Sequence, residues 1–443
     1  MSFPRYPKSK PSGVEWLGDV PEHWDIARAD AFLETGRDTI DADALNSQPV
    51  FHYSIPIVQE TGDGQLEDGT EIDSSKLVVS EPQILVSKLN PRKGTVCIAK
   101  PHDALTVCSS EFVPLIPVRA DIQFVWHLVQ TDNYRKRLES LVESATRSHQ
   151  RVLPSDVVKF RWAFPPLDEQ AAIASFLDRE TSKIDALVAE QQRLIELLKE
   201  KRQAVISHAV SKGLNPNAPM KPSGIQWLGD VPEHWELGRI KSLSSFVTSG
   251  PRGWSERIGE TGALFIQSGD LNDQLEVEFA TAKRVQVDND AESVRTRLHE
   301  GDVVVCVTGA KTGNVAVCEN IPHDAYVNQH VCLVRPNSEI LPMFLGLVLK
   351  SKLGQSYFEV SQYGLKQGLS LENINEAPVT LPDMDEQRKI ISYIDIETAK
   401  LAALTAQAEQ AIELLQERRT ALISAAVTGK IDVREEINAE TIS

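Results

Sequence analysis

The phrase KPSGVEWLGDVPEHW occupies residues 10–24, and the near-identical phrase KPSGIQWLGDVPEHW occupies residues 221–235. A second phrase also repeats, because Asp-Glu-Gln stands at residues 168–170 and again at residues 385–387. The first phrase recurs after 211 residues and the second after 217, so the repeat unit is roughly half of the 443-residue chain. The sequence therefore predicts two copies of one frame, whose inserts differ in length by six residues. Such an arrangement indicates one kind of task performed on two different targets.

Length and composition indicate a globular protein of two to four domains, since 41% of the residues are hydrophobic. Residues 1–13 are polar and proline-rich, unlike a signal peptide, and the apolar stretch at 340–349 is too short to cross a membrane. The cysteines form no Cys-x-x-Cys pair, so we expect reduced core residues of a cytosolic protein rather than a zinc site. They are Cys97, Cys108, Cys306, Cys318 and Cys332.

The net charge of −17 argues against nucleic-acid binding by the chain as a whole. Residues 26–165 hold 15 basic and 19 acidic groups, and residues 237–380 hold 13 basic and 17 acidic groups. Neither insert is basic, so any binding of DNA phosphates requires local basic loops or a field supplied by a partner.

Two long amphipathic helices are predicted, one from Asp168 to Gly213 and one from Asp385 to Gly429. In each, the apolar residues fall within an arc of roughly 120°, which is one stripe on a helix of about 40 residues, or roughly 60 Å. A helix of this length must bury its stripe. The stripe can pack on the neighbouring domain or, as we expect, on the other helix.

Charged residues within the stripes predict the relative direction of the two helices. The interrupting residues are Glu180, Arg202, Glu397 and Arg419. A parallel pair would place like charges side by side, whereas an antiparallel pair places Glu180 against Arg419 and gives the other two residues opposite partners as well. The antiparallel register is centred on Gln191 and Ala408, and it pairs Arg202 with Glu397, Leu187 with Ile412, and Ile195 with Leu404.

Both inserts show the pattern of mixed strand and helix. The predicted buried strands are residues 83–88 and 302–308, each followed by a polar loop at 89–94 or 309–314 and by a return strand ending near Cys97 or Cys318. Pro-His-Asp-Ala then recurs at 101–104 and 322–325, so we expect one fold for both inserts. A later stretch, residues 145–151, aligns with residues 362–368.

These loops carry the side chains that recognise base edges in DNA, where Arg or Lys pairs with guanine and Asn or Gln pairs with adenine. Any one of these polar residues could equally be a solvated loop residue. The candidates in the first insert are Lys88, Asn90, Arg92, Lys93, Arg147, His149, Gln150 and Arg151. The candidates in the second insert are Thr308, Lys311, Thr312, Asn314, Gln362, Tyr363, Lys366 and Gln367.

The sequence contains no catalytic motif. Gly-x-Ser-x-Gly, His-Glu-x-x-His, an EF-hand loop and a Walker lysine are missing, and Phe164-Pro165-Pro166-Leu167 lacks the acid or amide and the aromatic residue of a methyltransferase motif. Asp383 stands too close to Lys389 for a nuclease pattern, and both lie at a predicted helix start. We expect His23 and His234, each inside Pro-Glu-His-Trp, to be structural. The chain is therefore expected to be a binding subunit.

The order of variable domain, long helix, variable domain and long helix resembles the specificity (S) subunit of Type I restriction-modification systems, the HsdS family. The phrases Pro-Ser-Gly-x-x-Trp-Leu-Gly-Asp-Val-Pro-Glu-His-Trp, Pro-Pro-Leu-Asp-Glu-Gln and Lys-Gly-Leu-Asn-Pro-Asn (212–217) carry the resemblance. It implies an α+β fold with a pseudo-two-fold internal repeat, in which two mixed α/β target recognition domains are separated by two long helices paired as an antiparallel coiled coil. The expected segments are 1–165 (first recognition domain), 166–213 (first helix), 214–380 (linker and second recognition domain), 381–430 (second helix) and 431–443 (tail).

The resemblance also implies a function. Each recognition domain would bind one half of a bipartite site in double-stranded DNA, while the helices set the spacing and dock two methyltransferase subunits. Restriction subunits are possible further partners. S-adenosylmethionine, ATP and Mg²⁺ would bind only to partner subunits, none to this chain, which would act in the cytoplasm without a membrane. The alternatives are the specificity subunit of a methylation-only complex, a non-enzymatic coiled-coil scaffold, and an enzyme with its own activity.

Overall fold

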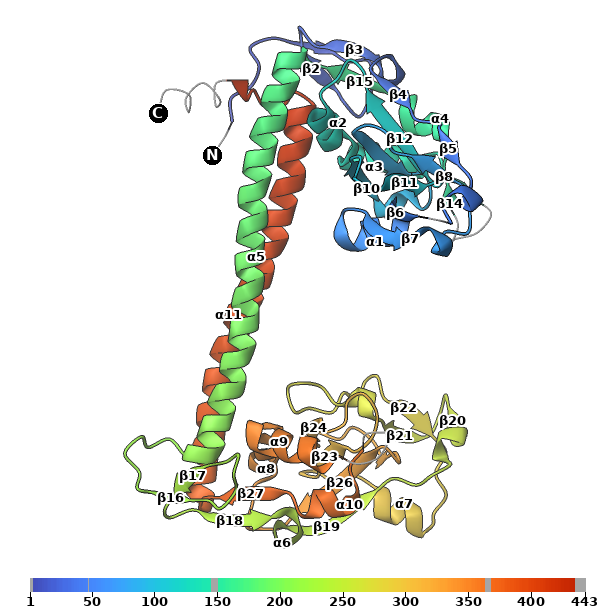
Figure 1. The fold of residues 1–443 in the computed structure, drawn as a ribbon. Coiled ribbons are helices and arrows are strands. Elements are labelled where there is room, and N and C mark those ends of the chain that lie inside the picture. Colours follow the sequence, from blue (N-terminus) through green and yellow to red (C-terminus); the bar gives the residue numbers. More distant parts are fainter. Residues whose placement is uncertain (1–2, 47, 145–149, 363–367, 435–443) are drawn as a thin grey trace. The chain divides into compact units, whose positions relative to one another are not determined.

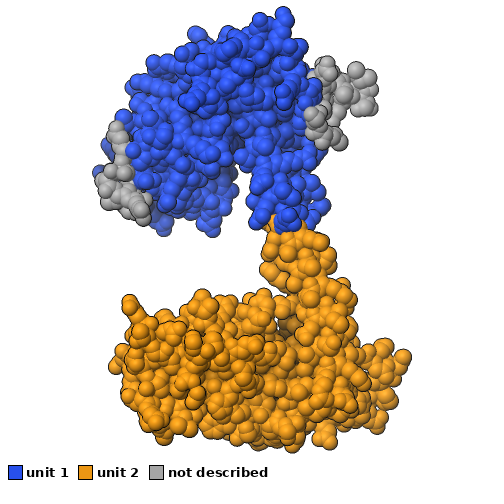
Figure 2. All heavy atoms as spheres, turned by 180° about the vertical axis from the view of Figure 1, so that it is seen from behind, with its two compact units in different colours: residues 1–191, 410–443 blue, residues 192–409 orange. Residues whose placement is uncertain are grey.

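The structure is a computed structural model that describes residues 3–46, 48–144, 150–362 and 368–434 (Figure 1). The chain divides into two compact units, residues 1–191 with 410–443 and residues 192–409 (Figure 2). Each unit combines one mixed α/β domain with one half of each long helix, α5 (Leu167–Lys212) and α11 (Met384–Val427). The boundary between the units therefore lies inside both long helices. The segment limits that the sequence suggested at residues 165 and 380 stay a prediction.

The domain of the first unit contains two main sheets. The first sheet has the order β10-β9-β12-β4, formed by β10 (Val96–Ala99), β9 (Gln83–Ser87), β12 (Phe112–Pro117) and β4 (Leu33–Thr35), all antiparallel. The second has the order β5-β8-β11-β6-β7, formed by β5 (Thr39–Ile40), β8 (Lys76–Val78), β11 (Leu105–Ser109), β6 (Pro49–Tyr53) and β7 (Gln65–Asp68). Every residue of β9 is buried, which agrees with its apolar centre Ile84-Leu85-Val86.

The second unit repeats the first of these sheets. The order β19-β26-β23-β24 is formed by β19 (Ser244–Ser249), β26 (Val331–Pro336), β23 (Val303–Cys306) and β24 (Val315–Val317). The other sheet has the order β20-β22-β21-β25, formed by β20 (Ile258–Gly259), β22 (Lys283–Val285), β21 (Ala263–Ile266) and β25 (Ala325–Val327). The second sheet of each domain contains one parallel pair of strands, β11 with β6 in the first domain and β21 with β25 in the second. The strands on either side of this pair are arranged differently in the two domains. The copies thus share one sheet and diverge in the other.

Short strands join each domain to the repeated phrases, and short helices complete it. The strand pairs are β1 (Ser9–Pro11) with β2 (Asp19–Pro21), β3 (Asp25–Arg28) with β15 (Arg161–Phe164), β13 (Glu143–Ser144) with β14 (Gln150–Arg151), β16 (Met220–Pro222) with β17 (Asp230–Pro232), and β18 (Glu236–Arg239) with β27 (Pro378–Leu381). The helices are α1 (Ile55–Thr61), α2 (Ile122–Val129), α3 (Asp132–Ser140), α4 (Pro154–Val158), α6 (Ile240–Leu243), α7 (Ala291–Thr296), α8 (Pro342–Lys350), α9 (Lys352–Ser361) and α10 (Leu371–Asn375).

The two repeated phrases bind each other within each unit. The Glu169 carboxylate, in the first turn of α5, accepts hydrogen bonds from Trp24 Nε1 at 3.0 Å and from the Tyr6 hydroxyl at 2.6 Å. In the second unit, Glu386 at the start of α11 accepts a hydrogen bond from Trp235 Nε1 at 2.9 Å. The histidine of each phrase contacts the same carboxylate, His23 at 2.6 Å and His234 at 2.9 Å. Both histidines therefore contact the start of a long helix, the structural role that the sequence predicted.

The glutamine of each Asp-Glu-Gln fixes a long helix to its domain. Gln170 Oε1 accepts the backbone N–H of Asp121, the N-cap of α2, at 2.8 Å. Gln387 Oε1 accepts the N–H of Leu341, the N-cap of α8, also at 2.8 Å. Both glutamines are buried, with 1% and 0% of their surface exposed. The repeat is thus explained by one contact made twice.

A lysine near the end of a long helix binds each Trp-Leu-Gly-Asp loop. Lys430, just after α11, donates to the carbonyl oxygens of Leu17 at 2.9 Å and Asp19 at 2.6 Å. Lys212, the last residue of α5, donates to the equivalent oxygens of Leu228 and Asp230. The order of residues is reversed between the copies, Lys212-Gly213 against Gly429-Lys430, yet the ammonium group binds the same pair of carbonyls.

The long helices pack against each other in antiparallel direction inside each unit. In the first unit, Leu177 and Ile184 of α5 share a hydrophobic core with Leu422 and Ala426 of α11. In the second unit, residues 206–210 of α5 share a core with Ile390 and Ile394 at the start of α11. The same cores contain domain residues, so the helix ends pack on the domains as well as on each other. The α+β class with paired helices is therefore confirmed.

The predicted ion pairs between the helices are wrong. Arg419 Nε donates to Asp185 Oδ1 at 3.0 Å, five positions beyond its expected partner Glu180. Glu180 instead binds Lys183 at 2.8 Å on its own helix, and Glu397 binds Lys400 at 2.6 Å on its own helix. A lysine three residues away on the same helix can bind a glutamate whatever the position of the other helix. The predicted pairing of opposite charges between the helices therefore did not determine how they are aligned.

Two of the predicted apolar contact residues also lie outside the centre of the helix contact. Leu187 and Leu404 keep 45% and 47% of their surface exposed, whereas Ile195 and Ile412 are half-buried. Arg202 Nε is buried without a hydrogen-bond partner in the described part of the chain, and Glu397, its expected partner, pairs with Lys400. The apolar stripe on each helix was predicted correctly. Because the stripe is broad, several alignments of the two helices would bury it, and the sequence did not distinguish between them.

Candidate nucleic-acid interface

Three separate segments meet at one end of the shared sheet in the first domain. The backbone N–H of Lys88 donates to the carbonyl of Glu111 at 3.0 Å, and the N–H of Val152 donates to the carbonyl of Lys88 at 3.1 Å. The N–H of Asn90 also donates to the carbonyl of Gln150 at 2.7 Å. We call this arrangement the three-segment junction. It brings together the two groups of candidates that the sequence placed some 60 residues apart.

The second domain builds the same junction from equivalent segments. The N–H of Val307 donates to the carbonyl of His330 at 2.9 Å, and the N–H of Leu369 donates to the carbonyl of Val307 at 2.8 Å. A β-bridge joins Thr308 to Gly368. The expectation of one fold for both inserts is therefore confirmed for the shared sheet and its junction, down to individual backbone bonds, while the other sheet differs.

The middle segment of each junction was missed from the sequence. It is the turn after β11, which contains Glu111, and the turn after β25, which contains His330. Glu111 and His330 are 219 residues apart, close to the spacing of the repeats, but the residues of the two turns differ. Only the nearby repeat Pro-His-Asp-Ala could have indicated that the turns are equivalent. Arg252 was not among the candidates either; it is exposed and stands two residues after Gly250, whose N–H donates to the carbonyl of Asn328 in the second turn at 3.1 Å.

The side chains that occupy the two junctions are chemically different. In the first, Arg151 makes a bidentate pair with Glu111, with both N–O distances at 3.1 Å, and this pairing raises the pKa of Arg151. In the second, the Thr308 hydroxyl lies 2.5 Å from Nδ1 of His330, and Gly368 takes the place of the arginine. One backbone arrangement therefore presents two different sets of donors and acceptors.

Several candidates point outward from the first junction. Arg92 is exposed, and no residue in the described ranges accepts a hydrogen bond from it. Lys93 is also exposed, and its ammonium donates to Gln59 Oε1 at 3.2 Å. Lys88 is half-buried at the end of β9. Gly94 (φ +59°) and Asn90 (φ +50°) adopt left-handed backbone conformations, which turn the loop tightly enough to present Arg92 and Lys93 together.

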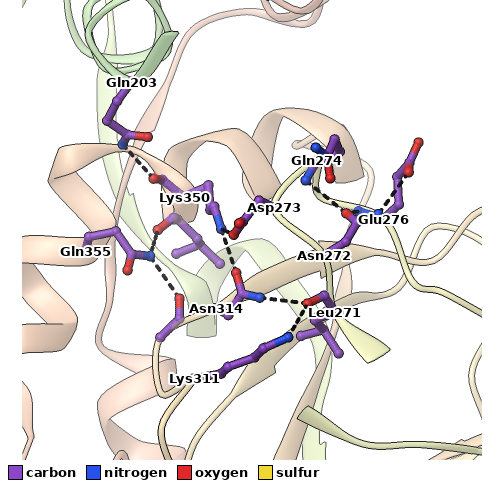
Figure 3. A network of polar contacts seen from close by, with 12 residues as sticks. Gln203, Leu271, Asn272, Asp273, Gln274, Glu276, Lys311, Asn314, Lys350 and Gln355 are labelled. Carbon is purple, nitrogen blue, oxygen red and sulfur yellow. Dashed lines mark hydrogen bonds and ion pairs between the residues drawn. The ribbon is translucent and has the colours of Figure 1, made fainter. Parts of the chain in front are cut away.

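Other candidates bond inward and shape their own loops. Asn314 Nδ2 donates to the carbonyl of Leu271 at 3.0 Å, and the Lys311 ammonium donates to the carbonyls of Gly269 and Leu271 at 3.2 and 3.4 Å (Figure 3). The Thr312 hydroxyl donates to the carbonyl of Gly309 at 2.7 Å. Contact of these residues with DNA stays a prediction, and the structure gives them a positioning role.

The remaining candidates divide into two groups. Gln150 and Gln362 are half-buried within the described residues. Arg147, His149, Tyr363, Lys366 and Gln367 lie outside the described residues.

The structure adds three observations, on the cysteines, on metal binding and on membrane-spanning helices. All five cysteines are free and buried, and burial raises the pKa of the Cys108 thiol to about 12. Within the described ranges, no group of three or more His, Cys, Asp and Glu residues could hold a metal ion. Among the same residues, no helix is long and apolar enough to span a membrane.

Comparison with known proteins agrees with this architecture. Residues 232–414 match the family model described as the Type I restriction modification DNA specificity domain. The chain is 25% identical over 328 residues to the EcoBI specificity subunit of Escherichia coli, an alignment that spans 68% of this chain and 67% of that one. It is 22% identical over 321 residues to the EcoKI specificity subunit of Escherichia coli K12, spanning 70% of this chain and 65% of that one.

Two solved structures share the fold. A chain from a study of complex assembly and conformational transition in a Type I restriction-modification system superposes with a TM-score of 0.72, at 17% identity, over 92% of this chain and 98% of that one. The HsdS subunit of Thermoanaerobacter tengcongensis superposes with a TM-score of 0.51, also at 17% identity, over 93% and 98% of the two chains.

Residues 232–414, which include most of the second domain and part of α11, thus match a class of DNA specificity domains. The chain is similar to the specificity subunits of Type I restriction-modification systems, the family that its repeated phrases predicted.

Proposed function

We propose that each domain binds one half of a bipartite double-stranded DNA site through its three-segment junction. The observation that supports this most is the repetition of the junction with changed side chains. Arg151 and Glu111 in the first copy correspond to Gly368 and His330 in the second, while the backbone bonds are the same. A constant backbone with unlike donors and acceptors suits recognition of two different base sequences.

Binding is expected to be weak for the isolated chain. Each insert carries four more acidic than basic groups, so the long-range field repels DNA, and only local groups such as Arg92 and Lys93 attract phosphates. Two methyltransferase subunits would supply the remaining positive field. We therefore expect tight, sequence-dependent binding only in the assembled complex, with a steep dependence on salt.

The helix pair offers a surface for those partners. In the second unit, Leu194, Leu197, Tyr393 and Ile396 on the two helices keep between 41% and 54% of their surface exposed. Burial of these exposed apolar side chains by a partner would be favourable. Restriction subunits would join the complex through the methyltransferase subunits or beside them.

No catalysis is assigned to this chain. S-adenosylmethionine, ATP and Mg²⁺ would bind to the partner subunits, which carry out methylation and cleavage. Since the target is the DNA of the cell, the complex would act in the cytoplasm. A complex that methylates without any restriction subunit would use this chain in the same way.

The test is selection of binding sites from a randomised double-stranded DNA library by the complex of this chain with its methyltransferase subunits. We expect two short conserved blocks separated by a spacer of fixed length. Exchange of residues 26–165 for the equivalent segment of another such subunit should change one block and leave the other unchanged. Enrichment of no sequence, or of one continuous block, would contradict the proposal.

Point variants refine this experiment. Arg92→Ala and Arg151→Ala should alter only the block bound by the first domain, and Arg252→Ala only the other block. Lys199→Ala is a suitable control, because this lysine is 65% exposed on α5 and its ion pair among the described residues is with Glu196 on the same helix. A change in both blocks from Arg92→Ala would contradict the assignment of one domain to each block.

A further inference from the structure

We propose that Lys350 is a positioning residue that determines the base specificity of the second domain without contacting DNA. This inference rests on the proposed function, because it assigns a role in the recognition of the second half-site. Lys350 is the last residue of α8, and its side chain is 19% exposed. It holds the loop that follows β23 against a neighbouring loop and against α8 (Figure 3).

The Lys350 ammonium joins two loops that are far apart in the sequence. It donates to Asn314 Oδ1 at 2.6 Å and to Asp273 Oδ1 at 3.2 Å. Asn314 in turn donates through Nδ2 to the carbonyl of Leu271 at 3.0 Å. The amide of Asn314 is therefore bonded on both sides, and its orientation is fixed by the charge of Lys350 and by the backbone of the neighbouring loop.

That neighbouring loop is itself well organised. Asn272 Oδ1 accepts the backbone N–H groups of Gln274 and Glu276, both at 2.9 Å. The carbonyl of Leu275 accepts the N–H of Val317 in β24 at 2.7 Å. Because this loop is fixed to the shared sheet, it gives Lys350 and Asn314 a firm support rather than a flexible one.

A chain of hydrogen bonds links the same point to the long helix α5. Gln203 Nε2 on α5 donates to the carbonyl of Lys350 at 2.9 Å. Gln355 Nε2, in the next helix, donates to the carbonyl of Leu349 at 2.8 Å and to the carbonyl of Gly313 at 2.9 Å. The position of residues 309–314 is thus set by the end of α8, which is in turn bonded to the long helix.

In the first domain a glutamine takes the place of this lysine. Gln130 stands at the corresponding position after α2, and within the described residues its side chain donates to the carbonyl of Trp126, at 3.2 Å. There the loop is held instead from α1, where Gln59 Nε2 donates to Thr95 Oγ1 at 2.9 Å. The two recognition loops are therefore positioned by different residues, and removal of Lys350 should affect one half-site only.

Loss of the Lys350 ammonium group should change the conformation of the loop at residues 309–314 and leave the rest of the domain unchanged. Asn314 is half-buried, so without Lys350 its Oδ1 loses a charged donor in a partly water-excluded place. The loop then gains freedom, and the side chains that it presents are no longer held at one base step. Displacement of a recognition element by a fraction of a base step lowers discrimination between bases more than it lowers total binding, since phosphate contacts tolerate movement.

The experiment compares complexes of the full chain with its methyltransferase subunits in selection from a randomised double-stranded DNA library. Lys350→Met keeps the aliphatic stem and removes the charge. We expect discrimination at one or two base pairs of the second block to fall about tenfold, which is the size of one base contact, while the first block is unchanged. Lys350→Arg should retain most of the discrimination.

The matched control is Lys352→Met, because Lys352 is exposed two residues away and its side chain makes no bond in the described part of the chain. This variant should bind with both blocks unchanged. Where Lys350→Met fails to fold, as judged by its thermal unfolding, Asn314→Ala removes the acceptor and should give the same loss in the second block.

Two results would overturn the inference. One is a folded Lys350→Met complex that discriminates between bases of the second block as strongly as the unaltered complex does. The other is an equal loss of base discrimination in both blocks. Failure of the unaltered complex to select any two-block sequence would instead refute the proposed function, so the two failures are distinguishable.

Discussion

Glu169 accepts a hydrogen bond from Trp24 at 3.0 Å, across 145 residues of sequence, and so joins the two phrases that occur twice in this chain. Glu386 and Trp235 make the same bond at 2.9 Å in the second unit. The two repeated phrases of the sequence thus bind each other in each unit. Their contact attaches each long helix to a β-strand pair of its domain.

Removal of this carboxylate should destabilise the protein. Glu169→Ala leaves the buried Trp24 indole and the Tyr6 hydroxyl without an acceptor, and we expect a loss of about 2–5 kcal/mol. Glu386→Ala should cost less, because the Glu386 side chain is 23% exposed against 6% for Glu169. Urea unfolding measures both changes. Glu22→Ala, at a 60% exposed position, is the control, and a similar effect from all three would contradict the account.

The lysine at the end of α11 should be important for the order of the first Trp-Leu-Gly-Asp loop. Lys430→Met removes the donor to the carbonyls of Leu17 and Asp19, so the loop should open locally. We expect a loss of about 1–2 kcal/mol and faster amide hydrogen exchange in residues 14–20. Lys8→Met, at a 78% exposed lysine, should change neither quantity. Unaltered exchange in the loop of the Lys430→Met protein would refute the role of this contact.

The helix pair offers a direct test of register. Arg419→Asp should lose the bond to Asp185 and create repulsion, at a cost of about 0.2–1 kcal/mol because the side chains are 33% and 56% exposed. Adding Asp185→Arg should restore stability, whereas adding Glu180→Arg should not. A double-mutant cycle measures the coupling. Rescue by Glu180→Arg alone would support the register expected from the sequence instead.

Stability of the first unit should fall in mild acid. His52 and His127 are 7% and 2% exposed, and burial lowers the pKa of both imidazoles despite hydrogen bonds to Glu67 and Asp178. Because an unfolded histidine titrates near about pH 6.5, the unfolded state binds protons first as the pH falls below that value. Stability is therefore complete above about pH 6.5 and decreases below it, toward the folded pKa of each histidine.

Unfolding by urea at pH 7.5 and pH 5.5, followed by hydrogen exchange, locates this effect. We expect the acid loss in peptides of residues 49–67 and 122–190. The groups that face His127 are Asp178, Asp121 and Arg419, and those that face His52 are Glu67 and Lys76. His127→Leu, which places there the residue found at position 347 in the second domain, should reduce the pH dependence. An unchanged slope in that variant would exclude His127 as a source.

Much of the fold was predictable because the patterns that specify it are local. Gln83–Ser87 and Val303–Cys306 are strands because a core of consecutive β-branched and apolar residues suits a fully buried strand. The helix start at Asp168 and the stop at Gly213 followed from capping, and α5 runs from Leu167 to Lys212. The antiparallel direction was correct as well, although it was inferred from ion pairs that do not form.

The candidate site was predictable only in part. The two outer segments of each junction were found because they repeat at nearly equal offsets. The turn with Glu111 or His330 was not, since a turn of two or three unlike residues carries no pattern. The sequence also could not distinguish Arg92, which points to solvent, from Asn314, which bonds to Leu271 and Lys350. Both are polar residues in polar loops, and only their surroundings separate them.

The sequence by itself determined the duplication, the two long helices, the central buried strands and the family resemblance, because repeats, periodicity and capping residues act within a few turns of the chain. The tertiary structure alone decided the partner of Arg419, the inward direction of Lys311, and the meeting of three segments at each junction. Those choices depend on packing between residues separated by tens or hundreds of positions. A hydrophobic stripe or a polar loop allows several such arrangements, and only the close fit of the folded chain selects one.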